Sequence, residues 1–296
     1  MTQPALSATS VSKRFGDFVA LEDLHLEVNP GEVVGFIGPN GAGKSTFLRT
    51  AVGLLKASGG ELSVLGHDPA RDPLSIRKRT SYLPGETNVY ASMTGKQFLS
   101  FNREFYKSQR PMPESLREQF EVPLDRSVRR YSAGMKQKVA LRATLEADVD
   151  LYLLDEPDRA LDANARLALR DWIQLLRDEG RAVLLSSHHL AEVEALADRS
   201  VFLLDGRNVS DERIRSARET LKKRIRMQLS REIDLPSGTT RSSVLPDGTI
   251  EVFVANDPAS WLSTLPEGVL ESAEIGATRL DDIYRVLTEH SSEVNA

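Results

Sequence analysis

Short runs of consecutive apolar residues recur through the first two hundred positions and predict buried strands. Four such runs are 33–37 (VVGFI), 151–154 (LYLL), 182–185 (AVLL) and 201–204 (VFLL). Unbroken apolar runs, unlike alternating ones, fit strands that are covered on both faces, as in a parallel sheet. The segments that separate them predict helices at about 44–55, 135–146 and 164–178. The pattern therefore predicts an α/β fold.

The stretch from about 94 to 120 predicts a helical insert between the first two core strands. Thr94 and Gln97 have the spacing of a capping box, in which each side chain bonds to the backbone amide of the other. The aromatic residues that then share one helical face are Phe98, Phe101 and Phe105. We expect a helical subdomain at about residues 85–146.

The character of the sequence changes after about residue 211. Residues 222–231 alternate between polar and apolar, and two further strand-like segments flank the turn 246–248 (PDG), which predicts a β-hairpin. A helix from about residue 258, a short strand near 269–275 and a last helix from about 280 follow. We therefore expect two domains, residues 1–212 and residues 213–296, the second a small α+β appendage without a cluster of site residues.

The composition narrows the class of protein. The 296 residues are 40% hydrophobic and 27% charged, a balance typical of packed globular chains. The sequence has no cysteine, which excludes disulfides, thiolate zinc sites and cysteine nucleophiles. The net charge of −5 gives no electrostatic reason to expect nucleic-acid binding. No apolar run approaches the ~18–20 residues of a membrane span, and the first residues lack a signal-peptide core. We expect a cytoplasmic chain that reaches a membrane only through a partner.

A glycine-rich loop carries the strongest chemical signal. Positions 38–45 (GPNGAGKS) match the phosphate-binding pattern G-x-x-x-x-G-K-[ST], between a predicted strand and a predicted helix. Glycines let successive amides curl around an anion, and the helix directs its positive end to the same point. We expect Lys44 to reach the β- and γ-phosphates and the Ser45 hydroxyl to coordinate Mg²⁺. The residues expected to bind nucleotide here are Gly38, Pro39, Asn40, Gly41, Ala42, Gly43, Lys44, Ser45 and Thr46.

The second half of a nucleotide site is expected where a buried strand ends in a carboxylate. Residues 151–157 read LYLLDEP, so Asp155 falls at the carboxyl edge of a strand, the usual ligand position in open α/β sheets. Asp155 is expected to hold Mg²⁺ through a water molecule. Glu156 follows it and can act as general base on the attacking water. ATP and Mg²⁺ are therefore the predicted substrate and cofactor.

Residues 131–137 (YSAGMKQ) lie upstream of this carboxylate pair and are diagnostic. They resemble the signature, usually written LSGGQ, of the nucleotide-binding subunits of ATP-binding cassette (ABC) transporters. The resemblance spans about residues 5–210 and implies a P-loop NTPase fold with a mixed core sheet, in addition to the helical insert and the appendage. In the family the signature faces the P-loop of a second subunit. Ser132 and the Gly134 backbone would thus touch the γ-phosphate in trans, at a helix N-terminus.

Other family positions are matched residue by residue. Phe15 stands where the family has an aromatic that stacks on adenine, and Asp162 ends the D-loop, which crosses the dimer interface. His188 follows a buried strand, at the place of the switch histidine that contacts the γ-phosphate. We interpret the neighbouring His189 as a surface residue. The resemblance thus implies catalytic roles for Glu156, His188 and Lys44.

The sequence departs from the family pattern in three places. Gly85 stands where the family usually has a glutamine that contacts Mg²⁺ and the attacking water and senses the permease. Glu86 is the nearest replacement, although its charge would repel the γ-phosphate. The D-loop reads Asp158-Arg159-Ala160 instead of Thr-Ser-Gly, and Ala133 replaces the first signature glycine. The first departure bears on the rate of hydrolysis and its coupling, and leaves ATP binding intact.

The resemblance implies a mechanism with two copies of the chain. Two ATP·Mg²⁺ would lie between the P-loop of one copy and the Ser132 segment of the other, and hydrolysis would release the dimer. A separate membrane permease would carry the cargo, with Gly85–Phe105 as the expected contact. Residues 279–284 (RLDDIY) weakly resemble a closing segment of multidrug and antibiotic exporter ATPases, so the resemblance favours an ABC-2 type exporter.

Three other interpretations stay open at the level of sequence. One is an ABC ATPase without a permease that acts on nucleic acid or ribosomes, although such members typically carry two cassettes or long coiled-coil insertions. A small-molecule kinase would leave the signature and residues 187–188 unexplained. A regulatory or mechanical subunit that binds ATP and transmits movement would fit the Gly85 departure.

Overall fold

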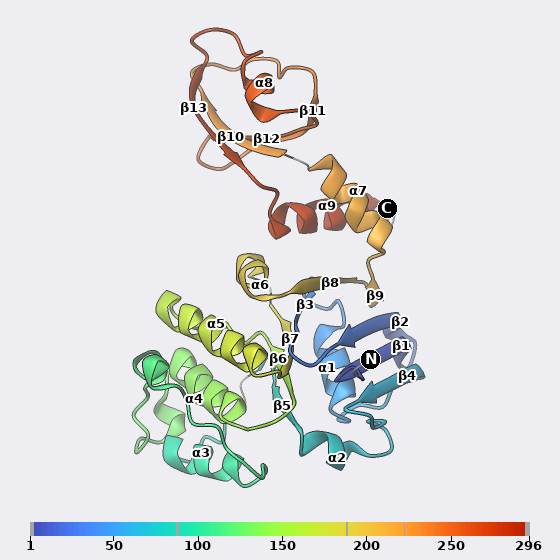
Figure 1. Ribbon diagram of the computed structural model, residues 1–296, viewed down its shortest axis with the longest axis vertical. Helices are drawn as coiled ribbons and strands as arrows, with labels where there is room; N and C mark the ends of the chain where they lie inside the picture. The colour runs from blue at the N-terminus through green and yellow to red at the C-terminus, as the bar shows by residue number, and fades with distance from the viewer. Residues whose placement is uncertain (1–2, 87–88, 188, 222, 294–296) are drawn as a thin grey trace. The chain divides into compact units, whose positions relative to one another are not determined.

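The computed structural model describes residues 3–86, 89–187, 189–221 and 223–293, with side chains described up to residue 289. The chain divides into two compact units, residues 1–208 and 209–296 (Figure 1). The predicted boundary after residue 212 falls in the first turn of α7 (Asp211–Thr220). The first unit contains all the residues that the sequence assigns to a nucleotide site.

The main sheet of the first unit has six strands in the order β5-β6-β7-β3-β8-β9. Their bounds are β3 (Val33–Ile37), β5 (Thr80–Leu83), β6 (Leu151–Asp155), β7 (Ala182–Ser186), β8 (Arg199–Leu204) and β9 (Arg207–Asn208). Neighbours are parallel except for β9, which runs antiparallel to β8. Every residue of β3, β6 and β7 is buried, which confirms the covered parallel strands predicted from unbroken apolar runs.

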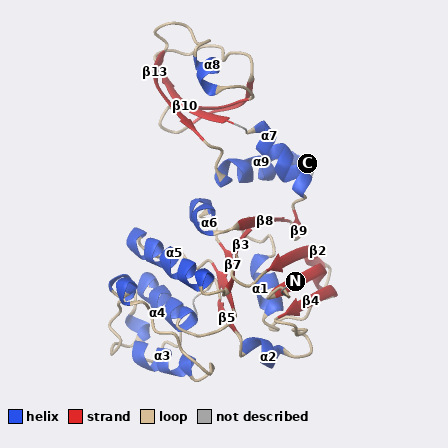
Figure 2. Ribbon diagram, in the orientation of Figure 1, coloured by secondary structure: helices blue, strands red, loops and turns tan. Residues whose placement is uncertain are grey.

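A second, antiparallel sheet is missing from the elements predicted above. It contains β1 (Leu6–Phe15), β2 (Phe18–Val28) and β4 (Gly59–Val64) in the order β2-β1-β4 (Figure 2). In β2 the buried Leu24, Leu26 and Val28 alternate with exposed His25 and Glu27. This period of two is typical of a strand with one buried face, so the signal was present in the sequence.

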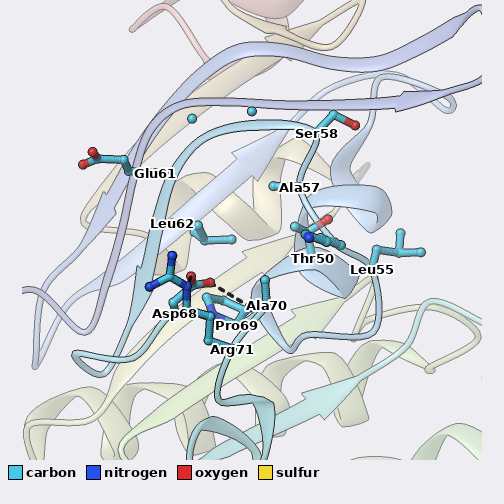
Figure 3. A pocket seen from close by; sticks show the side chains of 13 residues that line it. Thr50, Leu55, Ala57, Ser58, Glu61, Leu62, Asp68, Pro69, Ala70 and Arg71 are labelled. Carbon is cyan, nitrogen blue, oxygen red and sulfur yellow. Dashed lines mark hydrogen bonds and ion pairs between the residues drawn. The ribbon is translucent and has the colours of Figure 1, made fainter.

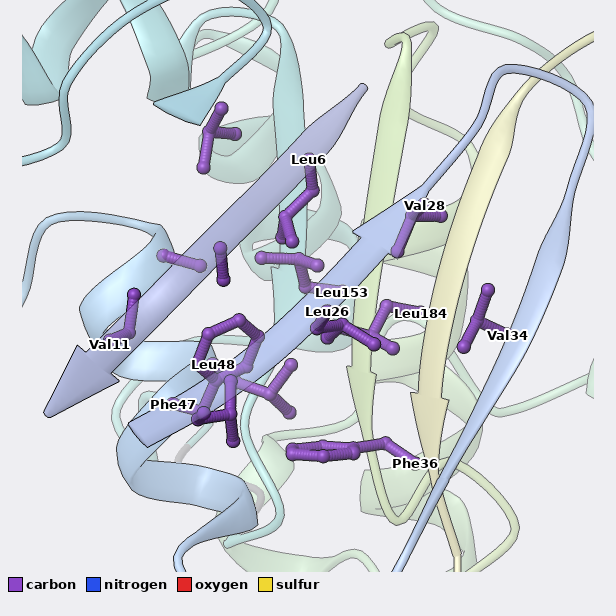
Figure 4. Packing of buried hydrophobic residues seen from close by; sticks show 14 of the residues in the cluster. Leu6, Val11, Leu26, Val28, Val34, Phe36, Phe47, Leu48, Leu153 and Leu184 are labelled. Carbon is purple, nitrogen blue, oxygen red and sulfur yellow. The ribbon is translucent and has the colours of Figure 1, made fainter. Parts of the chain in front are cut away.

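The core of the first unit lies between these sheets and α1 (Lys44–Ala51). Figure 4 shows apolar side chains from β1 and β2 facing those of β3, β6 and β7, with Phe47 and Leu48 of α1 among them. The rings of Phe36 and Phe47 pack edge to face at 5.6 Å. Each such side chain contributes about 1.5–3 kcal/mol when fully buried. Because α1 is anchored on this core, the loop that precedes it is held in place.

The helical insert contains α3 (Gly95–Arg103) and α4 (Ala133–Leu145). The capping box is confirmed, because the Thr94 side chain accepts from the Gln97 amide and the Gln97 side chain accepts from the Thr94 amide. The helix ends earlier than predicted, and three 3₁₀ turns follow at Glu114–Leu116, Glu118–Phe120 and Val128–Arg130. Phe105 therefore lies beyond the helix and is 58% exposed.

The other helices of the first unit are α2 (Pro73–Arg77), α5 (Ala163–Asp178) and α6 (Leu190–Leu196). On α5, Trp172 is buried and packs edge to face against Phe120 of the insert, at 5.3 Å. In the described ranges of the whole chain, none of the helices is both long and apolar enough to cross a bilayer.

The second unit is the predicted α+β appendage. Its elements after α7 are β10 (Lys223–Leu229), β11 (Thr239–Val244), β12 (Ile250–Val254), α8 (Pro258–Leu262), β13 (Leu270–Gly276) and α9 (Leu280–Glu293). The strands form one antiparallel sheet in the order β11-β12-β10-β13, and β11 and β12 confirm the predicted hairpin. A small apolar cluster joins Ile225 and Met227 of β10 to Trp261 of α8.

Candidate functional site

The glycine-rich loop connects β3 directly to α1, and two of its glycines are required sterically. A Cβ on Gly38 would lie 2.3 Å from the Leu203 carbonyl oxygen. Gly43 has φ 103°, and a Cβ there would lie 2.5 Å from the Ala20 carbonyl oxygen. Contacts this short exclude any side chain, so the loop can take its curled course only with glycine at both positions.

The N-terminus of α1 is arranged for an anion. In this described part of the chain, no side chain caps the helix, which begins after Gly43. First-turn amides without a side-chain acceptor, together with the helix dipole, favour a phosphate. Lys44 is buried beside them, and its Nζ donates to the carbonyl oxygens of Gly38 (2.5 Å) and Pro39 (3.0 Å). Burial lowers the pKa of Lys44, while the carboxylates of Glu156 and Asp155 act to raise it.

Asp155 ends β6 as predicted and is only 2% exposed. Its Oδ1 accepts from the Ser186 hydroxyl at 2.6 Å, whereas its Oδ2 is buried with no hydrogen-bond partner among the described residues. A buried carboxylate oxygen without a donor is costly unless a ligand compensates it. Oxygen donors are what Mg²⁺ prefers, and α1, which carries Ser45, packs against β6. Ser45 and Asp155 therefore fit a magnesium site.

Glu156 adopts a left-handed backbone, with φ 50°. Its amide is fixed by Ser186, whose carbonyl and hydroxyl oxygens lie 3.0 Å and 3.2 Å from the Glu156 nitrogen. A non-glycine residue in this region costs of order 1–3 kcal/mol, and such strain clusters at functional sites. The Glu156 carboxylate lies close enough to Lys44 to act on the pKa of that side chain.

Ser132 and Gly134 lie at the start of α4, apart from α1 and the glycine-rich loop of the same chain. The exposed Ser132 caps this helix, since its Oγ accepts from the Met135 amide at 3.2 Å. A Cβ on Gly134 would lie 2.9 Å from the Ala160 carbonyl oxygen. Lys138 Nζ lies 3.2 Å from Asp162 Oδ2. The signature thus packs against the D-loop of its own chain, and Figure 1 shows α4 and α1 on opposite sides of the main sheet.

Phe15 and the two histidines have different outcomes. Phe15 is 46% exposed at the end of β1, and Lys13 Nζ lies 4.7 Å from its ring centre, so part of the ring surface is open to a ligand. His188 lies outside the described residues. His189, interpreted as a surface residue, has a side chain that is 40% exposed, and its Nδ1 lies 2.5 Å from the buried Asp158 Oδ2.

Gly85, where the family usually has a glutamine, lies next to the Asp155 carboxylate. A Cβ on Gly85 would lie 3.2 Å from Asp155 Oδ2, so a larger residue would crowd that carboxylate. The Gly85 carbonyl accepts from Arg159 Nη1 at 3.0 Å. Two of the three departures from the family pattern are therefore in direct contact.

Sequence reasoning missed two polar residues that support the site. Ser186 bonds to Asp155 and Glu156, and it is the register partner of Asp155 in the parallel pair β6–β7. Strand pairing could have found it, since both residues end apolar runs. The buried Gln137 donates from Nε2 to the Pro157 carbonyl at 2.9 Å, which ties α4 to the segment after Glu156. Nothing in the local pattern marks that contact.

A separate hollow of about 560 Å³ lies near the other end of α1 (Figure 3). It is lined by Thr50, from the last turn of α1, and by residues 55–62 and 68–71. At its rim Asp68 accepts from the Ala70 amide at 2.8 Å. Lys44 begins the same helix, so this hollow lies away from the glycine-rich loop.

Comparisons with known proteins agree with this geometry. The family model described as ABC transporter matches residues 21–159. The ABC transporter ATP-binding protein NatA of Bacillus subtilis is 37% identical over 212 residues, 68% of this chain and 86% of the relative. The daunorubicin resistance ATP-binding protein DrrA2 of Streptomyces coeruleorubidus is 31% identical over 98% of this chain and 96% of its own. A solved ATP-binding subunit of an ABC transporter superposes with TM-score 0.64 at 30% identity, covering 72% of this chain and 92% of that one.

The first unit thus has the fold of an ABC ATPase, with the glycine-rich loop and the buried carboxylate at one edge of its sheet. The chain belongs to the ABC transporter family, as an ATP-binding subunit. Its activity is the ATP hydrolysis that this family couples to transport.

Proposed function

We propose that two copies of this chain enclose two ATP molecules and drive a separate membrane permease that exports its cargo. The observation that carries the proposal is the set of groups found where β3 and β6 of the main sheet end. There, among the described residues, α1 starts without a side-chain cap, Lys44 is buried, and Asp155 Oδ2 has no hydrogen-bond partner. A triphosphate with its metal would satisfy all three groups. It supplies anionic oxygens to the α1 amides and to Lys44, and a cation to the Asp155 carboxylate.

In this proposal the loop from Gly38 to Thr46 binds the phosphates through its amides, and Phe15 stacks on the adenine. Lys44 exchanges its carbonyl partners for the β- and γ-phosphates. Ser45 and Asp155 would hold Mg²⁺, which when bound neutralises phosphate charge. Glu156 accepts a proton from the attacking water, and His188 steadies the γ-phosphate.

The site is completed by a second copy. Ser132, Gly134 and Asp162 belong to α4 and the D-loop, and α4 lies across the main sheet from α1, so a single chain leaves its phosphate site open on one side. The exposed N-terminal turn of α4 offers a second positive helix end. ATP placed between two such ends relieves their mutual repulsion, which makes association depend on nucleotide.

The segment Gly85–Phe105 is the proposed permease contact. Tyr90 is 55% exposed, and its ring lies 5.4 Å from that of Phe101, which in turn packs at 5.0 Å on the exposed Phe105. A cluster of exposed aromatic side chains is typical of an interaction surface, whereas single exposed aromatics are ordinary. Through this contact the chain would sit at the cytoplasmic face of a membrane.

Export of the ABC-2 type is the proposed direction of transport. The support is the length of the match with the daunorubicin resistance protein, which extends through the appendage as well as the ATPase unit. A second candidate role is a subunit that binds ATP and transmits movement with slow turnover. The observation that favours it is Gly85, which supplies no side chain to the metal or water.

Engineered cysteines test the arrangement, because the natural chain has none. A chain carrying Asn40→Cys, Ser132→Cys and Glu156→Gln is expected to form a covalent dimer under mild oxidation only with ATP and Mg²⁺. The control carries Asp178→Cys, at the far end of α5, in place of Ser132→Cys. Equal cross-linking in the two chains, or none with ATP, would contradict the shared site.

A further inference from the structure

The two residues after Pro157 make contacts that the family residues at these positions could not both make. Asp158 is 4% exposed, and its Oδ2 accepts from the Ser187 hydroxyl at 2.9 Å. The same oxygen lies 2.5 Å from His189 Nδ1. The Ser187 hydroxyl also accepts from the His189 amide at 2.9 Å. One buried carboxylate therefore holds the residues on both sides of position 188.

Arg159 reaches in the other direction. Its Nη1 donates to the Gly85 carbonyl at 3.0 Å, and Gly85 is the residue packed on the Asp155 carboxylate. The short side chains Thr and Ser, usual in the family, would have no charge for the first contact and no reach for the second. Asp158 and Arg159 together thus join the Gly85 loop to the residues on either side of position 188.

The backbone between these contacts and the chemistry is short. Glu156 precedes Pro157, and Asp158 and Arg159 follow directly. Gln137 holds the Pro157 carbonyl, and Ser186 holds the Glu156 amide, so the intervening residues are fixed from both sides. Glu156, Asp158 and Arg159 therefore belong to one short, fixed stretch of backbone, which sets the outer loops in a defined position relative to Glu156.

We propose that Asp158 and Arg159 are positioning residues for ATP hydrolysis, which hold the Gly85 loop and the residues Ser187 and His189 in register with Glu156. The proposal rests on the proposed function, because it concerns the same hydrolysis. Among the described residues, neither side chain forms a hydrogen bond or ion pair with the loop from Gly38 to Thr46, so their loss is expected to change the turnover rate and leave ATP affinity as it is. In this account the pair takes over the ordering of the Gly85 loop that a glutamine side chain would supply.

The test uses the full chain and two readouts. In nucleotide-free protein, Asp158→Ala is expected to speed hydrogen exchange of the His189 amide about tenfold, the effect of losing one or two net hydrogen bonds. In ATPase assays the same variant is expected to lower kcat about tenfold or more, as misplacement of a catalytic group does, with KM for ATP within about twofold of wild type. Asp178→Ala, an exposed aspartate on α5, is the matched control for both.

Arg159 is tested by rescue. Arg159→Ala is expected to lower kcat about threefold to tenfold, the range for one charge-assisted hydrogen bond to a carbonyl, and Arg159→Lys to recover most of the rate because an ammonium can reach the same oxygen. If Asp158→Ala does not fold, Ser187→Ala removes one arm of the network and must show the same faster exchange and lower kcat. A merely structural role would lower the melting temperature without the split between kcat and KM.

The outcomes separate the two levels of the account. An unchanged His189 amide, or an unchanged kcat in both alanine variants of an active protein, overturns the positioning role and leaves the proposed function standing. Wild-type protein that neither binds nor hydrolyses ATP overturns the proposed function, and the positioning role with it. Faster exchange with lower kcat and unchanged KM supports the proposal.

Discussion

Each unit contains a cluster of buried charged side chains, and the two clusters differ in how completely they are paired. In the second unit Glu251 is fully buried, and both its carboxylate oxygens are paired, one with Arg226 and the other with Arg285. Asp282 is 2% exposed and accepts from the Arg279 amide, from Arg285 and from the buried Arg224. Every carboxylate oxygen of this network has a donor, so the network needs nothing from outside.

In the first unit the buried Glu146 has both carboxylate oxygens paired, with Arg103 and Arg142, but the charges beside the glycine-rich loop are incompletely paired. Asp155 has one oxygen on Ser186 and one without a partner in the described residues, and Lys44 donates to neutral carbonyl oxygens. Burial of both groups without mutual pairing is costly. A buried charge network in which every oxygen has a donor stabilises the fold. Buried charges that are incompletely paired beside the glycine-rich loop instead indicate a binding site.

The largest expected effect breaks the site chemically. Glu156→Gln removes the proposed base and is expected to slow ATP turnover about 10²–10⁴-fold while ATP binding stays intact. Steady-state ATPase assays and a binding isotherm for ATP measure the two quantities. Glu118→Gln, on an exposed 3₁₀ turn, is the control and should match wild type. Turnover at the wild-type rate in the Glu156 variant would rule out that assignment.

The next effect breaks the completed network. Asp282→Asn leaves Arg224, 3% exposed, without its counter-charge and is expected to cost about 3–5 kcal/mol in the free energy of unfolding of the second unit. Chemical denaturation followed by circular dichroism measures it, and ATP affinity should not change. The neighbouring Asp281→Asn, at an exposed position, serves as the control. Equal stability of the two variants would show that the network does not hold this unit.

A smaller effect is expected at the phosphate loop. Lys44→Ala removes the charge that would face the β- and γ-phosphates and is expected to weaken ATP binding at least about tenfold, from the loss of charge-assisted hydrogen bonds. Fluorescence titration with an ATP analogue gives the affinity. The exposed Lys78→Ala should bind as wild type does. Unchanged affinity in the Lys44 variant would refute the phosphate-binding loop.

The smallest effect sharpens the comparison most. Asp155→Asn makes the same chemical change as Asp282→Asn, but it removes a charge whose Oδ2 has no hydrogen-bond partner among the described residues. It is expected to leave the free energy of unfolding unchanged or to raise it by about 1 kcal/mol, as losses of strained functional groups do, while ATPase activity falls. Thermal unfolding of the two variants side by side measures the contrast. A loss of stability as large as that of Asp282→Asn would show that Asp155 is structural.

Local patterns were sufficient to predict the parts of the site that are continuous in the chain. The loop from Gly38 to Ser45 lies between an apolar run and a helix, and Asp155 ends another apolar run, so motif and strand end together specify the edge of the sheet. The hairpin of the appendage is equally local. Each of these features is determined by residues a few positions apart.

The parts that escaped prediction depend on contacts between distant segments. The pair Asp158–His189 spans 31 positions, and Arg159 reaches Gly85 across 74. No periodicity encodes such contacts, so neither could be predicted from the sequence. The sheet of β1, β2 and β4 was missed although β2 alternates: β1 and β2 form a local hairpin, and only the pairing of β4 with β1 joins segments that are far apart in the chain.

The central claim is that nucleotide joins two chains across the edge where Asp155 and Lys44 lie. Light scattering on purified Glu156→Gln, with and without ATP and Mg²⁺, tests it most directly. The account predicts the mass of one chain without nucleotide and of two chains with it, with two ATP bound per dimer. A mass of one chain at saturating ATP would contradict the account.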